Sequence, residues 1–291
     1  RQLASIFPDT SAARFLEKLN GSHPTYLRRR ALPEEVKQIH ALGEIGIEFP
    51  REDERLYPQR ELAAHVLGYV DADGDGVMGM ERALNERLVA PNLRGTPAIL
   101  SIDSRAQAAL ESELQDAMLM TEARGAAGII LDVETGEVMA LASLPLFDPN
   151  KIRRATMKHQ NNEVTQSVFE LGSTFKPLTI AAALDAGTVT DLAVRYNAME
   201  PIKIGGFTIK DDHSQGRYLN VPETLVHSSN IVTARIADNL GQKAMEEMFR
   251  RLGFDERPHI ELFERGKPLW PRNWGRVTNM TVAYGHGIAV T

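Results

Sequence analysis

Two apolar runs joined by a short turn constrain the fold of this 291-residue chain more than any other feature of its sequence. Residues 127–133 and 137–143 are rich in aliphatic side chains, and Gly136 lies in the turn between them. Runs of this length around a glycine-containing turn are typical of a β-hairpin. A helical apolar spacing precedes them over residues 105–121, and further helical stretches follow. This order predicts an α+β fold, with an antiparallel sheet flanked by helices.

A change in composition divides the chain. Residues 90–97 contain two prolines and a glycine, as linkers and loops often do. The sequence before them is helix-rich, and residues 98–103 after them are predicted to form a short strand. We therefore predict a first domain over residues 1–94 and a second over residues 95–291.

The composition excludes several classes of protein. The chain has no cysteine, which removes thiol catalysis, disulfides, iron–sulfur clusters and cysteine zinc sites. Its 8 histidines are scattered without metal-ligand spacing, so we expect no metal and no cofactor. The net charge of −6, without a basic stripe, argues against a nucleic-acid partner. No apolar run reaches the roughly 18 residues of a membrane span.

A serine and a lysine three positions apart carry the strongest chemical signal. Ser173 and Lys176 precede a strongly apolar helical stretch, residues 178–184. The spacing places both side chains on one face of a helix start, within hydrogen-bond reach. A lysine can take the proton of a serine hydroxyl once burial and the helix dipole lower its pKa from about 10.4. Because Ser-x-x-Lys is common by chance, the nucleophile and base need support from a second motif.

That second motif is Ser228-Ser229-Asn230, between two helical stretches. A Ser-x-Asn turn between helices can point both outer side chains into a cleft. The Ser228 hydroxyl can relay a proton to a leaving nitrogen. The Asn230 amide can hold the lysine through its carbonyl and a substrate amide through its N–H groups. The two motifs together fit the pattern of serine penicillin-recognising enzymes.

These residues resemble those of a known family. Residues 170–177, Glu-Leu-Gly-Ser-Thr-Phe-Lys-Pro, resemble the nucleophile motif of class B penicillin-binding proteins. Residues 55–70 are similar to the N-terminal pedestal of that family, and residues 132–150 to the start of its transpeptidase domain. Residues 284–291 are similar to the stretch before the family's Pro-Leu-Gln segment. The resemblance covers nearly the whole chain.

The resemblance implies a serine D,D-transpeptidase that cross-links peptidoglycan. Ser173 would attack the penultimate D-Ala carbonyl of a stem pentapeptide, and β-lactams would acylate the same serine. Lys176 would be the base, Ser228 and Asn230 would complete the proton relay and the substrate clamp, and Thr174 would help to bind substrate. The Ser-Ser-Asn form of the second motif resembles the division-specific (septal) enzymes more than the elongation-specific ones.

The family also implies a location, partners and a missing part. Its members lie on the periplasmic face of the inner membrane, anchored by an N-terminal transmembrane helix that this chain does not contain. A membrane glycosyltransferase and division proteins are the expected partners, with residues 1–94 as a docking pedestal. The third motif of the family, Lys-Thr/Ser-Gly, is absent, and Gly266-Lys267-Pro268 cannot replace it because proline does not fit that paired strand. We expect that the C-terminal part is missing and that the 291-residue chain alone is inactive.

Other readings stay open. An elongation-type transpeptidase, a D,D-carboxypeptidase, a serine β-lactamase, a bifunctional enzyme, and a β-lactam sensor or scaffold could use the same serine and lysine. Residues 71–76 resemble the start of a calcium loop, but Glu81 falls one position early. A Ser-His-Asp hydrolase could use His227 or Asp211-Asp212-His213, although the chain lacks a Gly-x-Ser-x-Gly elbow.

Overall fold

The computed structural model describes residues 1–28, 31–50, 55–154 and 157–291, and the chain divides into two compact units, Arg1–Glu54 and Arg55–Thr291. The first unit is helical and has its own core. Its helices are α1 (Gln2–Ile6), α2 (Ala12–Leu19) and α3 (Pro33–His40). The core side chains are Leu3, Phe7, Phe15 and Ile39. The Ser11 hydroxyl caps α2 by accepting the Arg14 N–H, which satisfies a donor that the helix start leaves free.

The second unit begins with short elements. In chain order these are α4 (Ala64–Leu67), β1 (Tyr69–Val70), β2 (Gly76–Met78), α5 (Gly79–Ala83), α6 (Asn85–Val89) and the 3₁₀ turn η1 (Pro91–Leu93). Strands β1 and β2 pair antiparallel. Among the helices in the described part of the chain, none combines the length and the apolar character that a membrane span needs.

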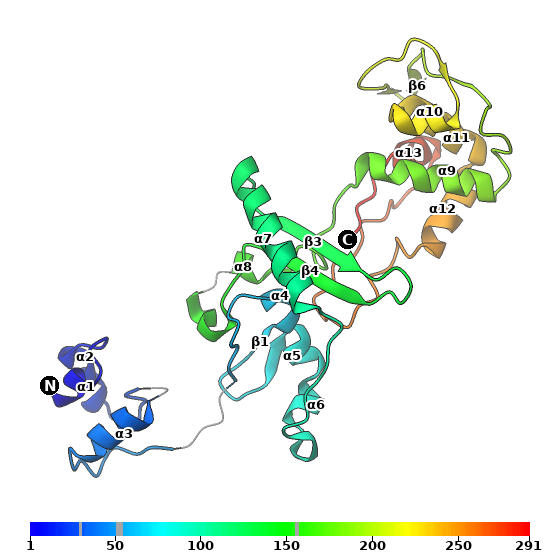
Figure 1. The fold of residues 1–291 in the computed structure, drawn as a ribbon. Coiled ribbons are helices and arrows are strands. Elements are labelled where there is room, and N and C mark those ends of the chain that lie inside the picture. The colour runs from blue at the N-terminus through cyan, green and yellow to red at the C-terminus, as the bar shows by residue number, and fades with distance from the viewer. Residues whose placement is uncertain (29–30, 51–54, 155–156) are drawn as a thin grey trace. The chain divides into compact units, whose positions relative to one another are not determined.

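The predicted hairpin and the helix before it are confirmed. Strands β3 (Ala126–Leu131) and β4 (Val138–Leu144) pair antiparallel, and α7 (Ser104–Thr121) packs against them (Figure 1). Leu110 and Leu114 of α7 press on Gly128 of β3, where an added Cβ would lie 3.0 Å from Leu110 Cδ1. The helix thus packs closely on this strand because the strand has no side chain at that point.

The strand predicted over residues 98–103 is wrong. The structure assigns no strand there. The Ser101 hydroxyl donates to the Val138 carbonyl oxygen, and the Asp103 N–H donates to that of Met139. The Asp103 carboxylate instead caps α7 through the N–H groups of Arg105 and Ala106. The segment therefore touches the edge of β4 while its end starts a helix.

A buried polar network joins the beginning of the second unit to the hairpin. Gln107 is fully buried and bonds both the N–H and the carbonyl of Leu141. It also donates to Glu111, whose carboxylate accepts the Ala63 N–H at 2.8 Å. Ala63 shares a hydrophobic cluster with Leu141 as well. Residues on both sides of position 94 share this core, and the division between the two compact units falls after residue 54 in the sequence. The domain boundary predicted at residue 94 stays a prediction.

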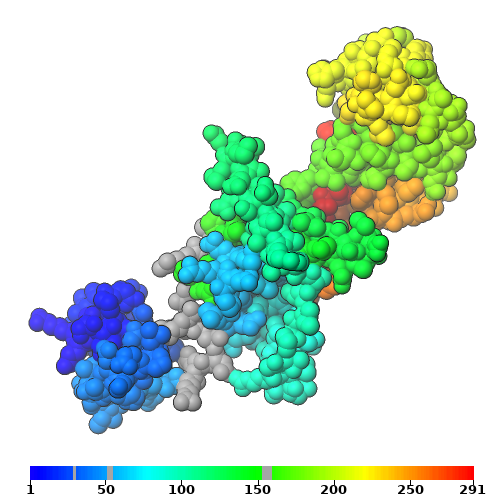
Figure 2. All heavy atoms as spheres, in the orientation of Figure 1, coloured from blue at the N-terminus to red at the C-terminus, as the bar shows by residue number. Residues whose placement is uncertain are grey.

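The rest of the second unit is mainly helical and positions the candidate site. Its elements are η2 (Pro149–Arg154), α8 (Met157–Gln160), η3 (Gly172–Phe175), α9 (Lys176–Asp185), β5 (Tyr196–Asn197), β6 (Ile202–Ile204), β7 (Phe207–Ile209), β8 (Tyr218–Leu219), α10 (Val221–Val226), α11 (Asn230–Leu240), α12 (Gln242–Arg251) and α13 (Arg276–Val282). Helices α9, α11, α12 and α13 gather into one cluster (Figure 1), and the atoms of this part of the chain form a continuous surface in Figure 2. An aromatic core of Phe175, Phe249 and Trp274 fixes the start of α9 against this cluster.

Candidate active site

Ser173 and Lys176 meet at the start of α9, but not within the helix itself. The α-helix begins at Lys176, and Ser173 lies in the preceding 3₁₀ turn η3, which corrects the predicted helix start at the serine. Phe175, with no exposed surface, anchors this turn in the core. Pro177 falls in the first helical turn, where its missing N–H removes no helical hydrogen bond. The Lys176 ammonium nitrogen Nζ lies 2.9 Å from Ser173 Oγ.

Ser228 of the second motif contacts the same lysine. Lys176 Nζ lies 2.6 Å from the Ser228 carbonyl oxygen and 2.8 Å from Ser228 Oγ. Ser228 Oγ in turn lies 3.0 Å from Ser173 Oγ. Ser228 adopts a left-handed backbone (φ 52°), which is unfavourable for a residue with a side chain and turns both of its oxygens toward the lysine. The structure therefore brings Ser173, Lys176 and Ser228 into one hydrogen-bonded triangle.

The surroundings of Lys176 oppose its charge. The residue is 1% exposed, and burial lowers its pKa, while the charges of Asp211 and Asp212 raise it by a smaller amount. A neutral amine has two N–H donors and one lone pair. The two oxygens of Ser228 can accept the donors, which leaves the lone pair for the Ser173 hydroxyl proton. The arrangement suits a base toward Ser173.

Asp211 holds the second motif from behind, a role that sequence reasoning missed. Its carboxylate accepts the Ser229 hydroxyl at 2.8 Å and the Ile231 N–H at 2.9 Å. The Ser229 hydroxyl also caps α11 by accepting the Val232 N–H. Asp211 lies 18 residues before Ser229, and no local spacing marks such a contact; the sequence suggested Asp211 only as part of a hydrolase triad.

Asn230 and Thr174 make different contacts from those expected. The Asn230 amide nitrogen donates to the Lys210 carbonyl oxygen at 3.1 Å. Among the described residues, the hydrogen bonds of Lys176 go to Ser173 and Ser228, and the predicted contact between the Asn230 carbonyl and the lysine is not one of them. The Thr174 hydroxyl donates to the Leu171 carbonyl oxygen within the turn. Substrate binding by Asn230 and Thr174 stays a prediction.

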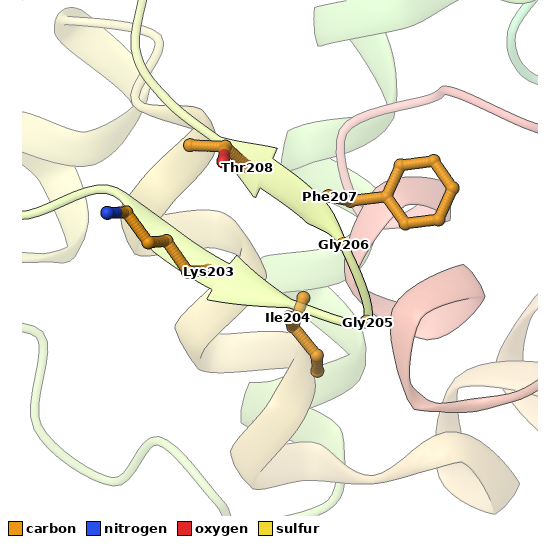
Figure 3. A pocket seen from close by; sticks show the side chains of 6 residues that line it. All are labelled: Lys203, Ile204, Gly205, Gly206, Phe207 and Thr208. Carbon is orange, nitrogen blue, oxygen red and sulfur yellow. The ribbon is translucent and has the colours of Figure 1, made fainter.

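The β6–β7 hairpin leads into the segment that carries Asp211. A hollow of about 310 Å³ lies over this hairpin, lined by Lys203, Ile204, Gly205, Gly206, Phe207 and Thr208. Figure 3 shows the side chains of Lys203 and Phe207 pointing to opposite sides of the hairpin. The hollow contains neither the serine nor the lysine of the triangle, so we do not assign the chemistry to it.

The competing sites receive no support from the geometry. His227 Nε2 lies 3.3 Å from Arg217 Nη2, and the Asp211 carboxylate is engaged by the second motif. The Asp71 carboxylate accepts the N–H groups of Asp73 and Asp75, as in an ordinary acidic turn. Within the part of the chain that the structure describes, no three His, Asp or Glu side chains are grouped to hold a metal ion.

Comparison with known proteins identifies the family to which this chain belongs. Residues 126–291, more than half of the chain, match the penicillin-binding protein transpeptidase domain. The chain belongs to this family of penicillin-binding proteins.

Individual members of the family share sequence with most of the chain. The chain is 39% identical, over 99% of its length, to a protein of Caulobacter vibrioides named probable peptidoglycan D,D-transpeptidase FtsI. It is 30% identical, over 91% of its length, to peptidoglycan D,D-transpeptidase FtsI of Escherichia coli. It covers 49% of each of these two relatives, so it spans about half of their length.

Solved structures agree with this assignment. Penicillin-binding protein 3 of Mycobacterium tuberculosis in its apo form superposes with a TM-score of 0.75 at 28% identity. The match covers 83% of this chain and 56% of that one. The same protein in complex with ampicillin matches equally well, with a TM-score of 0.75 over 82% of this chain and 55% of that one. The mixed helix and strand architecture is thus that of penicillin-binding transpeptidases.

Proposed function

We propose that the protein is a serine D,D-transpeptidase that acts through an acyl-enzyme on Ser173. The observation that carries this proposal is the triangle of Ser173, Lys176 and Ser228, with all three side-chain separations at hydrogen-bond distance around a buried amine. A serine next to a base with a lowered pKa is the arrangement that nucleophilic catalysis needs. The names of the relatives support the choice of reaction.

The reaction follows from the contacts of the amine. Lys176 takes the proton of Ser173 as Oγ forms a bond to the penultimate D-Ala carbonyl carbon of a stem pentapeptide. When the C–N bond breaks, Ser228 passes a proton to the leaving nitrogen, and D-Ala departs as an amine. An amine from a second stem peptide then attacks the ester, and its proton returns through the same groups to Ser173. The products are a cross-linked peptide and the free serine.

β-Lactams are expected to follow the first half of this path. Attack of Ser173 on the lactam carbonyl breaks the ring C–N bond, but the nitrogen stays tethered to the acyl group. The tethered group then occupies the position from which the amine of a second peptide would attack, so the acyl-enzyme persists. The structural likeness to a penicillin-binding protein solved with ampicillin supports this part of the proposal.

The test is to map penicillin adducts by mass spectrometry on the full-length protein. We expect one adduct, on the peptide that contains Ser173, and its loss in Ser173→Ala. Ser104→Ala is the matched control, because Ser104 is an exposed serine at the start of another helix, α7. An adduct on another peptide, or an undiminished adduct in Ser173→Ala, would overturn the assignment. Cross-linking of a disaccharide pentapeptide then separates a transpeptidase from a D,D-carboxypeptidase, which yields only hydrolysis.

The cellular role proposed here is septal cell-wall synthesis on the periplasmic face of the inner membrane. The Ser-Ser-Asn form of the second motif supports it, and so do relatives that carry the name FtsI. A membrane glycosyltransferase and division proteins are the proposed partners. Depletion of the protein in its own organism should give cells that elongate without dividing. Rounded cells would instead indicate an elongation enzyme.

A further inference from the structure

The chain just before Ser173 is fastened to a distant segment, residues 285–290. Phe169 and Val290 exchange two backbone hydrogen bonds, of 2.8 and 3.0 Å. The Gly172 N–H donates to the Gly285 carbonyl oxygen at 3.2 Å. The two segments therefore run side by side up to the residue that precedes Ser173. Nothing in the proton transfers proposed above uses these contacts.

The side chain of Glu170 adds a clamp between the same two segments. Its Oε1 accepts the Gly287 N–H at 2.8 Å, and its Oε2 lies 3.1 Å from His286 Nδ1. One carboxylate thus engages two consecutive residues of the opposite segment. The side chains are not buried: Glu170 is 48% exposed and His286 is 66% exposed.

Stability alone does not account well for this clamp. An exposed polar contact of this kind contributes no more than an exposed ion pair, about 0–1 kcal/mol, to folding. The same region is held by buried apolar side chains, Phe175, Ile288 and Val290, which lie in one core cluster. The carboxylate therefore adds little to whether the segments associate. Its hydrogen bonds are directional, and they fix how the chain enters the turn that presents Ser173.

Electrostatic control of the base is not the better explanation either. Burial lowers the pKa of Lys176, and the charges that act on that pKa are those of Asp211 and Asp212. Glu170 is not among them. An effect of Glu170 on the reaction should therefore come from geometry and leave the pH dependence of the reaction in place.

We propose that Glu170 is a positioning residue, which sets the place of Ser173 relative to Lys176 and Ser228 by clamping the entry of the nucleophile turn to residues 286–287. This role rests on the proposed acylation of Ser173. A displacement of about 1 Å between reacting groups can reduce a rate by up to a hundredfold, so a clamp beside the nucleophile has a measurable effect.

The experiment measures acylation of the full-length protein by a fluorescent penicillin in stopped flow, separating the dissociation constant of the first complex from the acylation rate constant. In Glu170→Ala we expect the rate constant to fall about tenfold with the dissociation constant unchanged. Glu170→Gln keeps an oxygen that can accept the Gly287 N–H, so it should recover part of the loss. His286→Ala keeps the Gly287 bond and loses only the contact with Oε2, so its rate constant should fall by less than that of Glu170→Ala.

Glu256→Gln is the matched control. Glu256 and His259 form another exposed pair, with Oε2 and Nε2 3.4 Å apart, that makes no contact with the nucleophile turn. It should acylate as the wild type does, and all variants should melt within about 2 °C of it. A wild-type rate constant in Glu170→Ala, or a loss in Glu170→Ala that Gln does not relieve, would overturn the positioning role. If the wild type takes no penicillin on Ser173, the proposed function itself fails, and this role fails with it.

Discussion

At the scale of single residues, opposing effects act on the pKa of Lys176. Burial lowers its pKa, whereas Asp211 and Asp212 raise it. A lysine accepts a proton only in its neutral form, so acylation should become faster as the pH rises through the pKa of Lys176. The acids shift that pH upward, while Asp211 also holds Ser229 and Ile231 in place.

The two roles of these acids can be separated by a pair of substitutions. Asp212→Asn and Asp211→Asn each remove a negative charge, which lowers the pKa of Lys176 further. The acidic limb of the acylation–pH profile should therefore move to lower pH in both, and less for the exposed Asp212 because solvent screens its charge. Only Asp211→Asn loses an acceptor for the second motif, so its plateau should also fall, by about tenfold. Stopped-flow acylation across the neutral range measures both quantities.

Two outcomes would contradict this interpretation. A limb that moves to higher pH would show that the carboxylates do not act on Lys176 through their charge. Equal plateaus in the two variants would show that the hydrogen bonds of Asp211 do not position Ser228.

At the scale of elements, the backbone of η3 is in close contact with the backbone of the loop after α13. Gly285 has a φ of +77°, and a Cβ added there would lie 2.2 Å from the Gly172 carbonyl oxygen. The contact is backbone against backbone, so it cannot be relieved by a change of rotamer. The start of the nucleophile turn and the loop after α13 must therefore keep or lose their positions together.

Gly285→Ala should slow acylation and destabilise the fold, and Gly187→Ala is its matched control. Gly187 also has a positive φ, +68°, but no atom lies within 4 Å of an added Cβ. The free energy of unfolding of the control should fall only by the cost of a left-handed backbone, about 1–2 kcal/mol. The free energy of unfolding of Gly285→Ala should fall by more than this, and its acylation should be at least about tenfold slower. Urea unfolding and penicillin acylation test this; equal behaviour of the two variants would show that the backbone contact tolerates a methyl group.

The same elements show what the sequence could and could not predict. The β3–β4 hairpin and α7 follow from local signals, apolar periodicity and a glycine turn, and both are confirmed. The strand over residues 98–103 failed because its apolar side chains do not reveal that Asp103 starts a helix. The meeting of Ser173 with Ser228 was expected only from the pairing of two motifs. Asp211 and the backbone contact at Gly285 were not foreseen, because both depend on contacts between distant segments.

At the scale of the whole molecule, the compact units do not follow the change in composition. The first unit ends at Glu54 and has its own core. Residues 55–94 instead supply buried side chains to the core around β4: Ala63 and Val66 share a cluster with Leu141 and Leu262. The shared core therefore favours residue 54 over residue 94 as the place where the chain can be divided, and the boundary predicted at residue 94 stays to be tested.

Two truncations distinguish these boundaries. Residues 55–291 keep the whole core of the second unit. The melting temperature of this fragment should therefore equal that of the second unit within the 291-residue chain. Residues 95–291 lose Ala63, Ala64, Val66 and Met78, all of them buried, and leave Glu111 without the Ala63 N–H. The burial of Val66 and of Met78 contributes about 1.5–3 kcal/mol each, which together is a large part of the total stability of about 5–15 kcal/mol of a domain. We therefore expect the shorter fragment to aggregate or to melt far lower in circular dichroism. If it melted like residues 55–291, the boundary near residue 94 would be the physical one, and the shared core would contribute little.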